Sequence, residues 1–252
     1  MEAVVTPVDE HDLYPCHEED TVPQGDPHFW QVHYLGGATQ AHRSDLRVTC
    51  DICHYWQPGN KKRYVAPDVS VIAGPPPAHR PNVYLAWRDP PLLFTAEIAS
   101  PSKRQADVKH KQAIYELILQ VPEHLDADPE RGLLALWQWG ESAYRAVPPD
   151  AHGRVWSERL GLWFGYDEDG FLRLYTREGE MLLTQEEEKE RADAEAQRAD
   201  AEAQRATSEA RRRVEAERQA QAEAQRRAEA ERRLGELTAE LERLRRNGPA
   251  PE

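Results

Sequence analysis

LLFTAEIA, residues 92–99, is an almost unbroken apolar run that follows two prolines, and it predicts a buried β-strand. Its one ionisable residue is Glu97, and a carboxylate inside a sheet is costly unless a cation or a metal pairs with it. Alternation along the strand places Glu97 on one face with Leu93 and Thr95, and Phe94 on the other. The sequence therefore predicts a buried acid that needs a partner.

The segment after this strand supplies a candidate partner for Glu97. Ser102 and Gln105 form an S-x-x-Q capping box, which predicts a helix that runs to about Leu119. Lys111 lies on the helical stripe that we expect to face the sheet, and Lys109 lies on the outer face. The other members of that stripe are Val108, Tyr115 and Ile118.

Composition divides the 252 residues into a head, residues 1–183, and a tail, residues 184–246, with a disordered end at 247–252 expected. Nearly all aromatic residues lie in the head, which also carries most of the net charge of −13. An acidic head argues against a protein that coats nucleic acid through a basic surface. Three cysteines make no secreted disulfide framework, and no apolar run approaches the length of a membrane span, so we expect a cytoplasmic protein.

The head reads as a mixture of helices and short strands. FWQVHYL predicts a short helix from His28 to Leu35 that Gly36 and Gly37 end. The remaining segments rich in β-formers predict strands at 46–55, 64–72, 133–139, 143–147, 161–164 and 171–176.

The head contains three motifs that belong together: Ala66-Pro-Asp-Val-Ser-Val71, Glu97-Ile-Ala-Ser-Pro-Ser102, and Asp107-x-x-x-Lys111 followed by Tyr115. In this combination they resemble the Uma2 family of restriction endonuclease-like proteins, in the PD-(D/E)xK nuclease superfamily. The resemblance covers roughly residues 20–183 and implies an α/β fold: a mixed-sheet core with flanking helices, followed here by a long C-terminal helix or coiled coil.

The resemblance also implies a site and a reaction. Asp68 and Glu97 would bind Mg²⁺, with Mn²⁺ as a substitute, for hydrolysis of DNA phosphodiester bonds. The superfamily places its lysine two residues after the acid, where this chain has Ala99, so the helix-facing argument selects Lys111 as the catalytic lysine. The simpler alternatives are structural carboxylates at Asp68 and Glu97, and an i,i+4 ion pair between Lys111 and Asp107. His28 either reaches the site from the first helix or is an ordinary helix residue.

One segment departs from the family pattern and opens a second hypothesis. Family members continue from the tyrosine into a hydrophobic strand that ends in Asp-Pro, whereas residues 119–129 here look shorter and more polar. Either the strand at Val121–Asp128 is degraded or the head has lost part of its core. The alternative function is a catalytically inactive nuclease-like scaffold whose tail mediates protein–protein interaction.

The tail predicts a long helix that opens with a Thr184–Glu187 capping box. Alanines recur in steps of four and three from Ala192 to Ala210, and a leucine seam follows at 234, 237, 241 and 244. The two seams do not share one register, so the heptad pattern is interrupted between them. A weak coiled coil, as a homodimer or with a partner helix, and a solvated single helix are equally compatible with this pattern.

Three further motifs are better explained by local structure. Cys50-Asp-Ile-Cys53 lacks a second cysteine pair for zinc. Ser100-Pro-Ser-Lys103 has the S-x-x-K spacing of penicillin-binding enzymes, but a helix cap explains it. Asp167-x-Asp-Gly170 lacks the twelfth-position glutamate of a calcium loop and reads as a hairpin turn.

Overall fold

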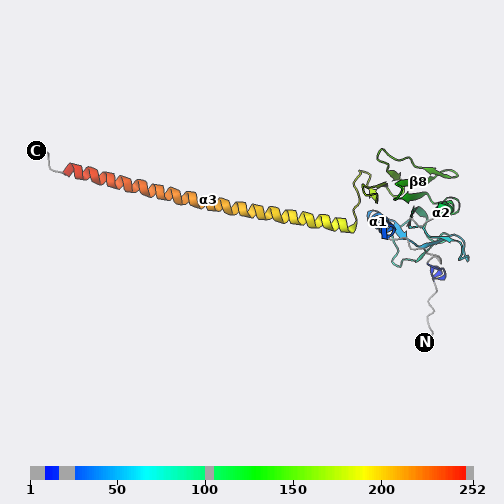
Figure 1. Cartoon of the computed structure of the whole chain (residues 1–252). Helices are drawn as coiled ribbons and strands as arrows, with labels where there is room; N and C mark the ends of the chain where they lie inside the picture. Colours follow the sequence, from blue (N-terminus) through cyan, green and yellow to red (C-terminus); the bar gives the residue numbers. More distant parts are fainter. Residues whose placement is uncertain (1–8, 17–25, 100–104, 248–252) are drawn as a thin grey trace, which may run out of the picture. The chain divides into compact units, whose positions relative to one another are not determined.

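The structure is a computed structural model that describes residues 9–16, 26–99 and 105–247. Contacts within the chain divide it between Thr184 and Gln185 into the head and one long helix. The head is a mixed α/β unit, and the helix, α3, is drawn in yellow to red in Figure 1. The predicted fold class, α/β with a long C-terminal helix, is confirmed.

A six-stranded sheet forms the centre of the head, in the order β1-β4-β6-β7-β8-β9. Its only parallel pair among the described residues is β6–β7, which is joined by helix α2 (Gln105–Leu117). Parallel neighbours need such a crossover, so the predicted strand and helix together form a β-α-β unit. The strand bounds are β1 Arg47–Cys50, β4 Val69–Ile72, β6 Leu92–Ile98, β7 Glu123–Asp128, β8 Leu133–Trp139 and β9 Tyr144–Ala146.

Two three-stranded sheets and two further helical segments complete the described head. One sheet has the order β3-β2-β5 and the other β10-β11-β12. We did not predict β5 and β10, which are only three residues long. The bounds are β2 Cys53–Tyr55, β3 Tyr64–Val65, β5 Val83–Leu85, β10 Val155–Ser157, β11 Leu162–Tyr166, β12 Leu172–Tyr175, the 3-10 helix η1 Glu10–Leu13 and α1 Asp26–His42.

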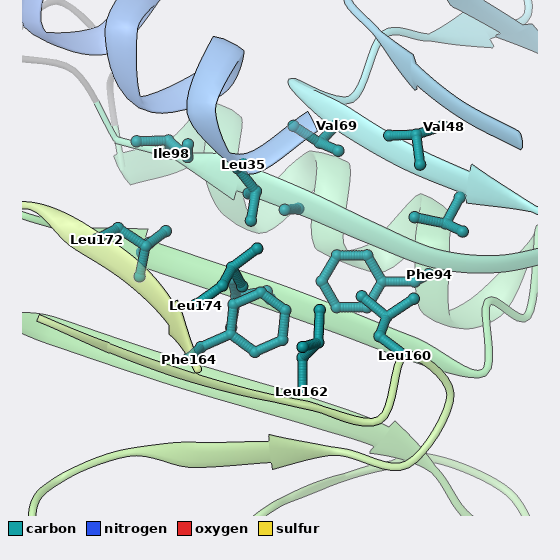
Figure 2. Packing of buried hydrophobic residues seen from close by; sticks show 14 of the residues in the cluster. Leu35, Val48, Val69, Phe94, Ile98, Leu160, Leu162, Phe164, Leu172 and Leu174 are labelled. Carbon is teal, nitrogen blue, oxygen red and sulfur yellow. The ribbon is translucent and has the colours of Figure 1, made fainter. Parts of the chain in front are cut away.

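The largest core lies between one face of the central sheet, helix α1 and the β10–β12 sheet (Figure 2). Phe94 of β6 stacks on Phe164 of β11, with ring centroids 5.5 Å apart and an interplanar angle of 6°. Leu35 of α1 is completely buried in the same cluster. This packing fixes α1 against the sheet and leaves the other sheet face to α2.

The second face of the sheet packs on α2 through Tyr115, which is fully buried, and Ile114. The predicted stripe is therefore shifted, because Ile118 is 46% exposed and Ile114 takes its place. Ile118 lies in the turn after the helix, where the helical period no longer sets the direction of its side chain. Lys111 keeps its predicted direction toward the sheet.

The prediction that Gly36 and Gly37 end the first helix is wrong, since α1 continues to His42. A Cβ atom on Gly36 would lie 2.5 Å from Sγ of Cys50 on β1. Gly36 is therefore a contact point where the helix backbone approaches a strand, and not a helix terminator.

Two of the predicted strands are each divided in two. The segment 46–55 breaks at Asp51, which has a φ of 52°, so β1 and β2 belong to different sheets. The segment 64–72 breaks at Ala66, Pro67 and Asp68. Asp68 is consequently the residue before β4 and not a member of a longer strand.

The expected degradation of Val121–Asp128 is also wrong. β7 occupies this segment and pairs with β6 on one side and β8 on the other. Its polar residues, such as Glu123 and His124, are buried and hydrogen-bonded, which the composition alone did not indicate.

Leu93 of β6 faces the opposite side of the sheet from the one predicted. Val71 pairs with Phe94 and Ile72 with Leu92, so Leu93 is an extra residue in the β4–β6 ladder. A bulge of this kind shifts the alternation by one position. Leu93 therefore packs with Phe94, and Leu92 packs on the α2 side.

Helix α3 runs from Gln185 to Asn247, which at 1.5 Å per residue is about 95 Å. Its described side chains are almost all exposed, and i,i+4 ion pairs such as Arg213–Glu209 and Arg227–Glu223 run along it. Each such pair adds only about 0.3–0.5 kcal/mol to helix stability. Among the described helices, α3 included, none combines the length and apolarity of a membrane span.

We predict that the head folds without the tail. A chain that ends at Leu183 should keep the cooperative thermal unfolding of the head, because Leu182 packs on the core and its carbonyl accepts a 2.6 Å hydrogen bond from Tyr34. A control chain that ends at Glu180 loses these contacts and should be about 2 kcal/mol less stable. Circular dichroism during heating measures both, and an unfolded 1–183 chain would refute the prediction.

Candidate functional site

Glu97 lies near the end of β6 with a side chain that is 2% exposed. The hydroxyl of Tyr115 donates a hydrogen bond of 2.6 Å to its Oε1. Lys111 Nζ lies 3.3 Å from Oε1 and 3.2 Å from Oε2. The buried acid that the sequence predicts thus has its partners on α2, one helical turn apart.

Lys111 reaches Glu97 because it lies on the face of α2 that packs on the sheet. Its Nζ also donates a 2.7 Å hydrogen bond to the carbonyl of Ala66, which precedes the Pro-Asp motif. Lys109 lies about 200° away around the helix and is exposed. The structure therefore brings Lys111, and not Lys109, to the acid.

Asp68 lies beside Glu97 and is the residue that precedes β4. Val69 pairs with Ala96, and this antiparallel register, continued by one residue, puts Asp68 opposite Glu97. Oδ2 of Asp68 accepts a 2.6 Å hydrogen bond from the backbone N–H of Ile98. The carboxylate is thereby fixed at the point where β4 begins and β6 ends.

His28 comes to the same place from the first turn of α1. Its Nε2 lies 3.7 Å from Oδ1 of Asp68, and the side chain is 8% exposed. The structure thus places His28 beside Asp68, and a role of His28 in the site stays a prediction. Asp107 lies on α2, but its side chain is outside the described part of the chain, as are Ser102 and the whole S-x-x-K motif.

Next to Glu97 lies a buried polar network that the sequence analysis does not predict. His124 is fully buried on β7, where Nδ1 is 2.9 Å from the Thr95 hydroxyl and Nε2 is 3.1 Å from Oδ1 of Asp126. Trp137 donates a 2.8 Å hydrogen bond to Oδ2 of the same aspartate. The parallel register pairs Glu97 with Asp126, so this network continues the row of acids across the sheet.

The His124 ring also contacts Tyr115, with centroids 4.7 Å apart. The network therefore packs against the same tyrosine that binds Glu97. The alternation in Glu-His-Leu-Asp-Ala-Asp, residues 123–128, is the signal that could have revealed it, because it places His124 and Asp126 on one face of a strand.

Two further buried polar groups of the head have shifted pKa values. Burial raises the pKa of Glu123, although the Ser157 hydroxyl and the backbone N–H groups of Arg159 and Glu158 donate hydrogen bonds to its carboxylate. Burial, together with the carboxylates of Asp51 and Asp68, raises the pKa of the Cys50 thiol to about 12.

The motifs set aside in the sequence have ordinary positions. Cys50 and Cys53 lie on strands of different sheets. Asp167 accepts hydrogen bonds from the backbone N–H groups of Asp169 and Phe171, and it caps the β11–β12 hairpin. Across the described residues, no three or more His, Cys, Asp and Glu side chains are arranged to hold a metal ion.

Comparison with known proteins identifies the family. The Uma2 model, described as "Putative restriction endonuclease", matches residues 18–167. The chain belongs to the Uma2 family. The predicted family is confirmed.

The chain was also compared with solved structures and with curated proteins. The chain is similar to the crystal structure of a "putative nuclease belonging to DUF820" from Anabaena variabilis, with 18% identity and a TM-score of 0.42. The match covers 56% of this chain and 76% of that one. No curated protein matches the chain.

We predict that the Tyr115 hydroxyl stabilises the fold by holding the Glu97 carboxylate. Tyr115→Phe keeps the buried ring and removes a donor to a charged acceptor, so it should cost about 1.5–3 kcal/mol. Tyr144→Phe is the matched control, because its hydroxyl donates to the neutral carbonyl of Val121, and it should cost about 1 kcal/mol. Urea unfolding measures both, and equal losses would contradict a charged Glu97.

Proposed function

We propose that the head is a Mg²⁺-dependent endonuclease that hydrolyses phosphodiester bonds of DNA. The observation that carries the proposal is that Asp68, just before β4, and Glu97, on the adjacent strand β6, share one end of the sheet with Lys111. A buried acid, a second acid and a lysine in one place are the groups that metal-assisted phosphodiester cleavage requires. Membership of Uma2 supports the nuclease reaction.

The two carboxylates suit a hard divalent cation. Mg²⁺ is commonly held by one or two carboxylates, with water and substrate phosphates as its other ligands, so Asp68 and Glu97 are sufficient protein ligands. Mn²⁺ accepts the same oxygen ligands. When bound, the metal would activate a water molecule and neutralise charge on the phosphodiester.

Lys111 would stabilise the negative charge that develops on the phosphoryl oxygens. Its contacts with Glu97, 3.2 and 3.3 Å, are long for a charge-assisted hydrogen bond. Its flexible stem allows the ammonium group to turn from the carboxylate toward a bound phosphate. Without metal, the same lysine neutralises the buried acid.

A second candidate function is the inactive nuclease-like scaffold. The Lys111–Glu97 ion pair favours it, because this pair satisfies the acid without a metal. The acidic net charge of the chain, −13, also opposes the approach of DNA. The degraded strand no longer supports it, because β7 is intact.

The first test removes one of the proposed metal ligands. Asp68→Asn should abolish Mg²⁺-dependent nicking of plasmid DNA and weaken Mn²⁺ binding in calorimetry. The fold should persist, because the amide oxygen still accepts the Ile98 hydrogen bond. Asp126→Asn is the control, since this neighbouring acid is held by His124 and Trp137, and its nicking rate should stay within a few-fold. Wild-type protein that neither nicks DNA nor binds metal would favour the scaffold.

The second test compares the two lysines of α2. Lys111→Met should lower the nicking rate about a hundredfold or more, because it removes a charge from the proposed transition-state site. It should also lower the melting temperature, since the buried Glu97 loses its cation. Assays are therefore run well below the melting transition, with Lys111→Arg as a variant that keeps the charge.

Lys109→Met is the matched control for Lys111→Met. This lysine is exposed, so both the rate and the melting temperature should change little. If the two methionine variants lose activity equally, or if Lys109→Met loses more, then the assignment of Lys111 is wrong.

A further inference from the structure

Helix α3 exposes a short row of large apolar side chains near its C-terminal end. Leu234, Leu237 and Leu241 are 68%, 59% and 59% exposed. Their spacing of three and four residues puts them on one face of the helix. An exposed leucine row of this kind on a long charged helix is typical of a helix that pairs with another.

The charges of α3 are distributed unevenly along its length. Residues 185–210 contain nine acidic and four basic residues, whereas residues 211–247 contain eight acidic and eleven basic ones. Two copies of the helix therefore complement each other in charge when they run in opposite directions. They place like charges together when they run in the same direction.

The alanine row in the acidic half has carboxylates on both of its edges. Ala192, Ala196 and Ala199 form the row. The residues that flank this row are Asp193, Glu195, Asp200 and Glu202. In a parallel pair these positions face each other across the interface, so their like charges would repel.

The two apolar rows are mirror images in their spacing. Counted inward from the N-terminal end, the alanines advance by four and then three residues; counted inward from the other end, Leu241, Leu237 and Leu234 do the same. Ala192 and Leu241 also lie almost equally far from the two ends of α3. Two fully overlapping antiparallel helices therefore bring each of these three alanines, Ala192, Ala196 and Ala199, level with a leucine.

We propose that α3 pairs with α3 of a second copy of this chain in antiparallel orientation. Ala192, Ala196 and Ala199 of one helix face the leucines at 241, 237 and 234 of the other. Small residues opposite large ones let both rows pack in successive layers. The different registers of the two rows are compatible with this pairing, because one row packs against the other and not against itself.

Cysteine cross-linking of the full chain tests the orientation. Cys16, the exposed native thiol, is first replaced by serine. The single variants Ala192→Cys and Leu241→Cys are then oxidised separately and as a mixture, since a disulfide requires Cα atoms within about 7 Å. We expect cross-linked dimer in the mixture, and only the Cys16→Ser background level in either variant alone.

Two controls separate this pairing from its alternatives. Ala194→Cys and Ala239→Cys lie at the same level of the pair but on its outer surface, so their mixture should stay at background. Light scattering should give the mass of a dimer. Cross-linking of each single variant with itself would indicate a parallel pair, and a monomer mass at millimolar concentration would exclude self-pairing; either result overturns the proposal.

Discussion

The buried carboxylate of Glu97 is the constraint on which the head depends. An uncompensated charge in the middle of a sheet costs several kcal/mol, so β6 is stable only when a cation and a hydrogen-bond donor reach it. Lys111 and Tyr115 meet this requirement from successive turns of α2. The packing of α2 on the sheet therefore also neutralises Glu97. A shift of this helix would change the geometry of the site at the same time.

Much of this arrangement could be predicted from the sequence, because it rests on local periodicity. A single acid in an apolar run identified Glu97, and helical spacing selected Lys111 over Lys109. The order of strand β6 and helix α2 follows from the same patterns, whereas the strand β7 after them does not. These patterns are reliable because they repeat over a few residues. A sequence that breaks one of them would bury an unpaired charge or expose apolar side chains.

The remaining features depend on contacts between distant segments. Gly36 looks like a helix end in the sequence, and only the proximity of Cys50 explains it. The bulge at Leu93 exists only in relation to β4, and the polar residues of β7 are tolerated only because partners on other strands bind them. Sequence patterns do not contain these pairings, so faces and boundaries were predicted less well than the elements themselves.

The two glycines in α1 have a consequence for motion. A glycine inside a helix costs about 1 kcal/mol relative to alanine, so α1 owes its helical form to docking on the sheet and not to its own propensity. Its amide hydrogens are thus expected to exchange with solvent through a single opening of the whole helix. Since α1 carries His28 to Asp68, each opening would remove the histidine from the acid. The His28 side of the site would then form and come apart together with helix α1. The rate would be set by the contact between α1 and β1 at Gly36, which has no side chain.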